Sequence, residues 1–250
     1  MKRTSILLLA GFMVLGISCS KDDDDNTLPA GFKYGKAVKI GNGNAMTFFE
    51  PNEHNHPVSA GIIIDAAALD NLPGHETFFT LPMPDEMIAT TPYRLVSLDW
   101  NPHGHGPAPI YDKPHFDMHF YMISEGEREL IDVNNPAMNR LPDPTFLPAR
   151  YIGEEGGISK MGKHWVDFAS PELSGAPFKT TFVYGTYDAK VIFQEPMISR
   201  DYLLTKPDTL MNIGQPAKVA LSSHYPTQYR IRYDAAGSRY FISLTAFEHK

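Results

Sequence analysis

The amino-acid sequence predicts a mainly β fold, in which a single sandwich or barrel-like domain carries two or three short helices. Proline and glycine are frequent, with 21 and 19 copies in 250 residues, and this density of turn-forming residues favours short strands over long helices. Two pairs of strand-like segments flank turn signals, at residues 180–185 and 190–193 and at residues 229–233 and 239–247. Each pair predicts a β-hairpin.

Two short segments predict helix. Residues 65–71 are rich in alanine and end before Pro73 and Gly74. Residues 199–206 begin at Ser199, a residue type that caps helix N-termini, and end before Pro207, which cannot continue a helix. The rest of the β-rich domain is predicted to form strands and turns.

The composition is that of a folded domain. Apolar residues make up 42% of the chain, aromatic residues 12% and charged residues 20%, values that do not match a disordered protein. The net charge of −7 leaves no basic excess to neutralise phosphates, which argues against nucleic acid as a partner. The sequence contains neither a G-x-S-x-G nucleophile elbow nor a phosphate-binding loop.

The N-terminal segment predicts export. Lys2 and Arg3 precede an apolar run at residues 6–17, which is shorter than the roughly 20 residues needed to span a bilayer. The run ends just before Cys19, the chain's one cysteine. We predict a signal peptide at residues 1–18, a lipidated cysteine and flexible acidic tether at residues 19–36, and a single β-rich domain at residues 37–250.

This segment resembles a bacterial lipoprotein signal, in which Cys19 is lipidated and becomes the mature N-terminus. The resemblance implies attachment to a membrane through the lipid on Cys19, in the cell envelope, as an outer-membrane lipoprotein. The four aspartates at residues 22–25 are similar to acidic tethers that bring some Gram-negative lipoproteins to the cell surface. A solubilising spacer explains them equally well.

Histidines are concentrated between residues 99 and 122. Four of the chain's ten lie within 17 residues: His103, His105, His115 and His119. From residue 115 onward polar and apolar side chains alternate, and successive side chains of a strand point to opposite faces. The alternation therefore predicts a strand with one apolar face and one face that presents His115, Asp117 and His119.

Imidazoles combined with a carboxylate suit a divalent metal ion, with zinc favoured and iron, manganese or copper also compatible. We predict that the metal ligands are His103, His105, His115, His119 and His164. Asp117 can ligate the metal directly or orient a ligating histidine. Asp117, Asp167 and Glu195 are the predicted catalytic acids or bases, with Glu172 as a further candidate.

The alternative interpretation is a solvated or hydrogen-bonded strand face, in which Asp117 forms an ion pair with one histidine. His54 and His56 form another pair with one residue between them, but they lie among turn residues and are interpreted as a loop. The remaining histidines at positions 75, 224 and 249 are expected on the surface.

Several motifs resemble a bacterial family known only as a secreted domain of unknown function. They are D-W-N-P-H-G-H-G-P at residues 99–107, P-H-F-D-M-H-F-Y-M-I-S at residues 114–124 and M-G-K-H-W-V-D at residues 161–167. The resemblance extends over most of residues 37–247 and implies an exported β-rich domain without an established activity. The cupins also present an H-x-H pair, but the glutamate that follows it in cupins is absent after His105.

Three functions remain open from the sequence. The first is a metal-dependent reaction on a small molecule, which requires a vacant metal position beside a pocket. The second is a binding module that holds a metal or ligand without turnover. The third is a structural protein that assembles, for example as a homo-oligomer.

Overall fold

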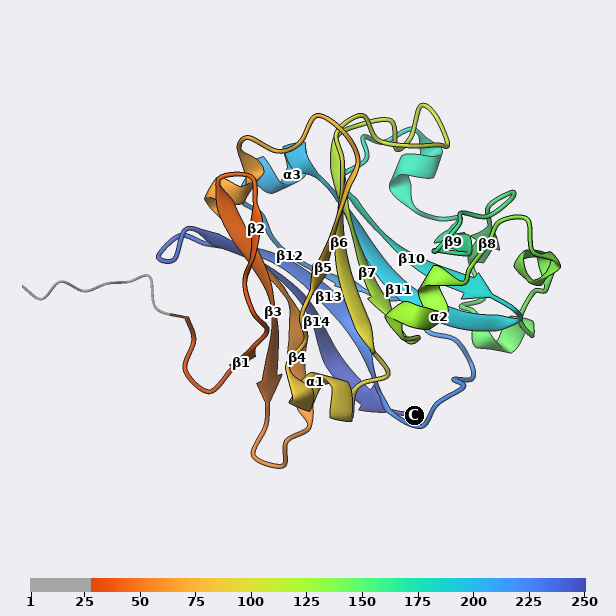
Figure 1. Cartoon of the computed structure of the whole chain (residues 1–250), viewed down its shortest axis with the longest axis horizontal. Coiled ribbons are helices and arrows are strands. Elements are labelled where there is room, and N and C mark those ends of the chain that lie inside the picture. Colours follow the sequence, from red (N-terminus) through yellow and green to blue (C-terminus); the bar gives the residue numbers. More distant parts are fainter. Residues whose placement is uncertain (1–27) are drawn as a thin grey trace, which may run out of the picture.

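Two antiparallel β-sheets of seven strands each pack face to face in the computed structural model (Figure 1), which describes residues 28–250. The predicted signal peptide, Cys19 and the acidic run lie outside the described residues. The end strands of the two sheets do not pair with each other, so the fold is an open sandwich rather than a closed barrel. The predicted mainly β class is confirmed.

The strands of the first sheet, in spatial order, are β1 (Lys33–Tyr34), β3 (Gly43–Pro51), β4 (Pro57–Asp65), β14 (Arg239–His249), β13 (His224–Asp234) and β12 (Asp208–Asn212), with β2 (Val38–Ile40) also paired to β3. The strands of the second sheet are β5 (Thr77–Leu81), β6 (Leu95–Asn101), β7 (His115–Tyr121), β11 (Lys190–Ser199), β10 (Thr180–Tyr187), β9 (Lys163–Asp167) and β8 (Tyr151–Gly153). Strand pairing thus begins at Lys33, inside the segment predicted as a tether.

Both predicted hairpins are present, as β10–β11 and β13–β14, and each is longer than the sequence signals indicate. The alanine-rich segment forms a 3-10 helix at Ala66–Leu69. The segment after Ser199 forms α3 (Arg200–Leu204), and the Ser199 hydroxyl accepts a hydrogen bond from the Tyr202 amide as a helix cap.

Further short helices occupy the connections. They are α1 (Asp85–Thr90), α2 (Glu125–Glu129) and the 3-10 helices Pro136–Asn139, Pro144–Phe146 and Pro171–Ser174. α2 begins with a capping box formed by Ser124 and Glu127. None of the helices within residues 28–250 is long and apolar enough to cross a bilayer.

The main core lies between the two sheets. Phe116, Met118 and Phe120 of β7 are fully buried there and belong to the same apolar cluster as Ile62 and Ile64 of β4. The predicted alternation along β7 is therefore confirmed for its apolar face. The polar face of β7 points away from the first sheet.

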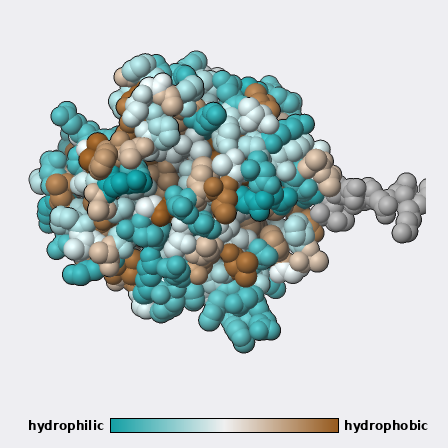
Figure 2. Space-filling model, turned by 180° about the vertical axis from the view of Figure 1, so that it is seen from behind, coloured by the Kyte–Doolittle hydropathy of each residue, from teal (hydrophilic) through white to brown (hydrophobic). Residues whose placement is uncertain are grey.

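A second apolar cluster covers the outer face of the second sheet. Connecting segments supply Tyr111, Ile131 and Phe178, which pack with Val183 and Met197 of the sheet. Figure 1 shows these connections, coloured yellow-green to teal, beside β7 to β11 on the side away from the first sheet. The polar face of β7 is therefore enclosed by loops. Figure 2 shows the molecule from behind the view of Figure 1, where apolar residues are scattered among polar ones.

Candidate metal centre

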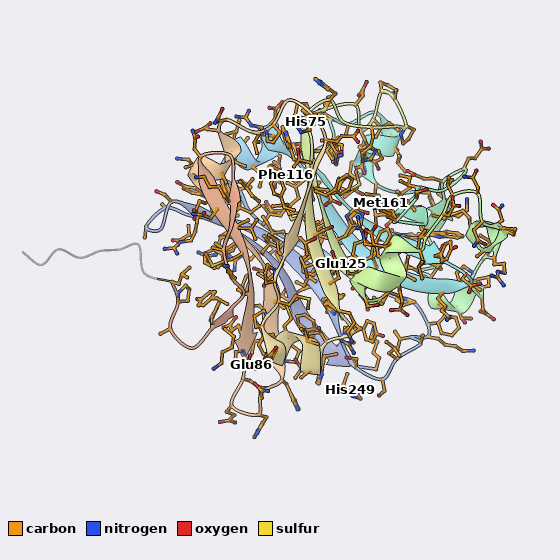
Figure 3. The ribbon with its side chains drawn as sticks, viewed as in Figure 1. His75, Glu86, Phe116, Glu125, Met161 and His249 are labelled. Atoms are coloured by element: carbon orange, nitrogen blue, oxygen red, sulfur yellow. The ribbon has the colours of Figure 1, made fainter. Side chains whose placement is uncertain are left out.

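The candidate centre lies on the outer face of the second sheet, under the covering loops. In Figure 3, Phe116 of β7 marks the side that faces the first sheet, and Met161 marks the loop layer over the outer face. β7 occupies the middle of the sheet, with β6 on one side and β11 on the other. A central strand with two partners holds its side chains in fixed rotamers, which suits a preorganised site.

The first candidate ligand group consists of His105, His115 and Asp117. The Nε2 atom of His115 lies 3.1 Å from Asp117 Oδ1, and Nε2 of His105 lies 3.2 Å from Asp117 Oδ2. The His115 side chain is completely buried, whereas the His105 side chain is 34% exposed. Asn101 of β6 donates a hydrogen bond of 2.7 Å to Asp117 Oδ2 and fixes the carboxylate.

Backbone carbonyls fix the protonation of both imidazoles in this group. His115 Nδ1 lies 2.6 Å from the Lys113 carbonyl oxygen, and His105 Nδ1 lies 2.8 Å from the Gly106 carbonyl oxygen. A carbonyl oxygen only accepts, so Nδ1 carries the proton in each ring. In the neutral ring, Nε2 then carries a lone pair that faces Asp117. Two acceptors at this distance require a cation between them, either a second proton on the imidazole or a metal ion.

The second candidate group consists of His119, His164 and Glu195, from β7, β9 and β11. Glu195 Oε2 lies 3.5 Å from His119 Nε2 and 3.7 Å from His164 Nε2. On its other side, His119 Nδ1 lies 2.9 Å from Asp99 Oδ2. A carboxylate behind a ligating histidine is the usual arrangement that orients the ring toward a metal.

The spacing of the ligand atoms fits a metal ion. With bonds of about 2.0–2.2 Å to nitrogen and oxygen, the ligands of a tetrahedral zinc site lie about 3.3–3.6 Å apart. The four distances from a histidine Nε2 to a carboxylate oxygen in these groups, 3.1, 3.2, 3.5 and 3.7 Å, are close to this range. Apart from their contacts with one another, four of these candidate ligand atoms are buried without a hydrogen-bond partner: His115 Nε2, Asp117 Oδ1, His119 Nε2 and Glu195 Oε2. Buried polar atoms are almost always satisfied. Divalent cations would satisfy the ligand atoms of both groups.

In the metal-free site, burial and neighbouring charges shift the pKa values of three histidines and of Glu195. Burial lowers the pKa of His105, but the hydrogen bond and charge of Asp117 outweigh burial and raise this pKa to about 9. The same opposition at His119, between burial and the carboxylates of Glu195 and Asp99, raises its pKa to about 9. Burial raises the pKa of Glu195 above its usual range and lowers the pKa of His164 to about 3.

A cavity of about 730 Å³ opens beside the two groups, and Asp99, Asn101, His105, Asp117 and His164 line it. This volume lies within the range of small-molecule sites. Residues of the covering loops, including Tyr111 and Met161, also line it. Both groups therefore have contact with a space large enough for water and a substrate.

The structure brings together four of the five predicted histidine ligands, namely His105, His115, His119 and His164, with Asp117 and Glu195. His103 is exposed and belongs to neither group. Gly104 has a φ of 67° and turns the loop, and a Cβ there would lie 2.0 Å from the Tyr111 carbonyl oxygen. Because of this turn, the side chains of the H-x-H pair diverge.

The predicted acids have different positions. Glu195 lies inside the second group as a candidate ligand. Asp167 lies away from the cavity, pairs with Arg150 and accepts a hydrogen bond from the Ala169 amide. Glu172 is buried and accepts a hydrogen bond of 3.2 Å from the Tyr111 hydroxyl, so it holds a residue of the cavity wall.

Sequence reasoning missed Asp99, Asn101 and Glu154. Asp99 and Asn101 lie on β6 directly opposite Asp117 and His115 of β7. The sequence does indicate Asp99 and Asn101, because residues 96–101 alternate between apolar and polar in the same manner as residues 115–122. Glu154 lines the cavity from a loop, where burial raises its pKa, and no local pattern marks it.

The fold and site define a β-sandwich protein with two adjoining groups of candidate metal ligands. Residues 54–100 match a family model described as TTHB210-like, hypothetical protein TTHB210. The matched segment extends from the β3–β4 turn to β6 and contains Asp99, but it ends before the first candidate ligand, His105. No curated protein and no solved structure matches the chain significantly.

Proposed function

We propose that the protein is a metal-dependent enzyme, in which each of the two ligand groups binds a divalent cation, with zinc favoured. The observation that carries this proposal is the number of ligands. Each group supplies three candidate ligands, and His105, Asp117 and His164 among them line an open cavity. Zinc sites of this kind are catalytic, whereas structural sites are closed by a fourth protein ligand. A divalent cation at such a site polarises a carbonyl oxygen or lowers the pKa of a water molecule.

The chain's own residues have distinct roles in this proposal. Asn101 fixes the carboxylate of Asp117, and Asp99 orients His119. The covering loops exclude bulk water and position the substrate against the ligands. The residues that line the cavity, all within the described part of the chain, include Glu76, Glu154 and Glu155 and no lysine or arginine. Five carboxylates line the cavity in all, more than the four positive charges that two divalent cations would bring, so we infer a small molecule that is neutral or cationic.

Elemental analysis of protein purified without an affinity tag tests the metal site. Wild-type protein is expected to hold metal at both groups. His115→Ala is expected to lose the metal of the first group and His164→Ala that of the second. His103→Ala is the matched control, because His103 neighbours the site in sequence and is exposed, and it is expected to retain both. Metal-free wild-type protein that cannot be reloaded with zinc would contradict the proposal.

Turnover is tested separately from binding. A neutral chromogenic ester should be hydrolysed faster than the corresponding phosphate monoester, and the activity should disappear in His164→Ala and after treatment with a chelator. Stoichiometric metal without turnover on neutral or cationic substrates would support the alternative, a protein that binds a metal or ligand at the cell envelope without catalysis.

We also propose that the protein is anchored in the cell envelope as an outer-membrane lipoprotein. The support for this is the sequence, in which the one cysteine, Cys19, follows a short apolar run and precedes an acidic segment. Cys19→Ser should release the protein from the membrane fraction. A variant that remains in that fraction would exclude anchoring through a lipid on Cys19.

A further inference from the structure

A second cavity, of about 460 Å³, lies on the other face of the second sheet. Tyr184 of β10 and Gln194 of β11 line it, whereas their chain neighbours Val183 and Glu195 face the metal centre. The two cavities have no lining residue in common. The second cavity is therefore separate from the proposed metal site.

The walls of this cavity are predominantly apolar. They include Met122, Ile123, Phe146, Val191, Val219 and Leu221. Leu221 is 46% exposed, and the other five are half-buried. These side chains line an open crevice, so an apolar ligand there would remove hydrophobic surface from water.

The polar groups at the inner end are already satisfied by one another. The Tyr93 hydroxyl donates to Gln194 Oε1, and Gln194 Nε2 donates a hydrogen bond of 3.0 Å to the Tyr184 hydroxyl. The Tyr184 hydroxyl in turn donates to the Gly214 carbonyl oxygen over 2.8 Å. A hydrocarbon chain can therefore reach this end without leaving a buried polar atom unpaired.

The charged groups of the lining are mainly basic. Lys190, Lys218 and Lys250 line the cavity, together with one acidic residue, Glu127. The Glu127 carboxylate is engaged in the capping box of α2 with Ser124. The lysine side chains thus leave a net positive charge beside an apolar crevice.

We propose that this cavity binds a fatty acid with a single hydrocarbon chain, with the chain against the apolar wall and the carboxylate beside the lysines. The apolar lining provides affinity for the chain, and the basic residues select the anionic head group. The lysines orient the ligand, because the polar groups at the inner end are already paired with one another. This inference does not depend on the proposed metal chemistry.

Binding of decanoate to the full chain tests the proposal by calorimetry, with decanol and decyltrimethylammonium as neutral and cationic comparisons. Decanoate should bind more tightly than either. Lys218→Ala should weaken decanoate binding about threefold, as expected for a partly exposed ion pair, and should leave decanol binding unchanged. Lys39→Ala is the matched control, because Lys39 is exposed on β2 and does not line the cavity.

A steric variant locates the site. Ala220 is exposed and lines the cavity, so Ala220→Trp should obstruct it and reduce decanoate affinity at least tenfold without affecting folding. Ala217→Trp, in the same segment but outside the lining, should bind as wild type. Equal affinity for all three amphiphiles would overturn the proposal. So would unchanged binding in Ala220→Trp, or binding that is lost in His115→Ala, since a carboxylate can also bind a metal.

Discussion

Replacing Gly185 with alanine tests how closely the second ligand group is packed. Gly185 lies opposite Phe193 in the β10–β11 hairpin and opposite His164 in β9. A Cβ atom at Gly185 would lie 1.9–2.3 Å from three atoms of the Phe193 ring. That ring is completely buried, and its centroid lies 4.8 Å from His119 and 5.3 Å from His164.

Carbon atoms in contact lie about 3.5–4.0 Å apart, so the ring or the hairpin must move by roughly 1.5 Å. Overpacking of this kind costs about 1–3 kcal/mol of folding free energy. A metal site tolerates displacements of only about 0.2 Å in its ligand distances. We therefore expect Gly185→Ala to lower the stability of the metal-free protein by that amount and to weaken zinc binding at the second group at least tenfold, with little effect on the first.

Urea unfolding and zinc titration against a chromophoric chelator measure the two effects. Gly126→Ala is the control, because Gly126 lies in α2 with no atom within 4 Å of the added Cβ. The control should be as stable as wild type or slightly more so, since alanine favours helix over glycine. Wild-type stability and wild-type zinc affinity in Gly185→Ala would refute the packing argument.

Three further predictions concern single carboxylates and pH. Asp99→Asn should weaken zinc binding at the second group by roughly 10- to 100-fold, because Asp99 lies 2.9 Å from His119 Nδ1; equal affinity in chelator competition would exclude this orienting role. The metal-free protein should lose stability as pH rises from about 6.5 to above 9, because folding raises the pKa values of His105 and His119 from 6.5 to about 9 and stabilises only their protonated rings. Urea unfolding at several pH values measures this loss, which zinc should suppress, and a flat curve without metal would count against it. Asp167→Asn should change stability by less than about 1 kcal/mol, because the partner of Asp167, Arg150, is 63% exposed. The zinc content should be unchanged, since Asp167 belongs to neither ligand group; loss of zinc would show that Asp167 contributes to the metal site.

The local parts of the structure were predictable from the sequence. Two-residue periodicity fixes which side chains share a face of a strand, and this rule places Asp117 and His119 together on β7. It also places Phe116 and Met118 in the core. The hairpins followed from turn residues between apolar runs, for the same local reason.

The convergence of distant segments was less accessible. His164 and Glu195 meet His119 only because the sheet has the order β7–β11–β10–β9, and strand order is not encoded in any single segment. Glu195 was therefore predicted as a proton carrier, whereas it lies where a ligand would. His103 and His105 were predicted as ligands from their close spacing in a loop, but that loop turns at Gly104 and His103 belongs to neither group.

The two ligand groups differ in how much of the chain must be organised before they exist. The residues of the first group lie between positions 105 and 117, so bringing them together closes only a short loop at a small entropic cost. The residues of the second group lie between positions 119 and 195 and meet only when β7 pairs with β11 and β9 pairs with β10. Binding to a group that exists only after folding contributes its free energy to folding. If both groups bind a cation as proposed, the first could bind before the sheets have formed, whereas the second could bind only after them and would stabilise the folded sheet.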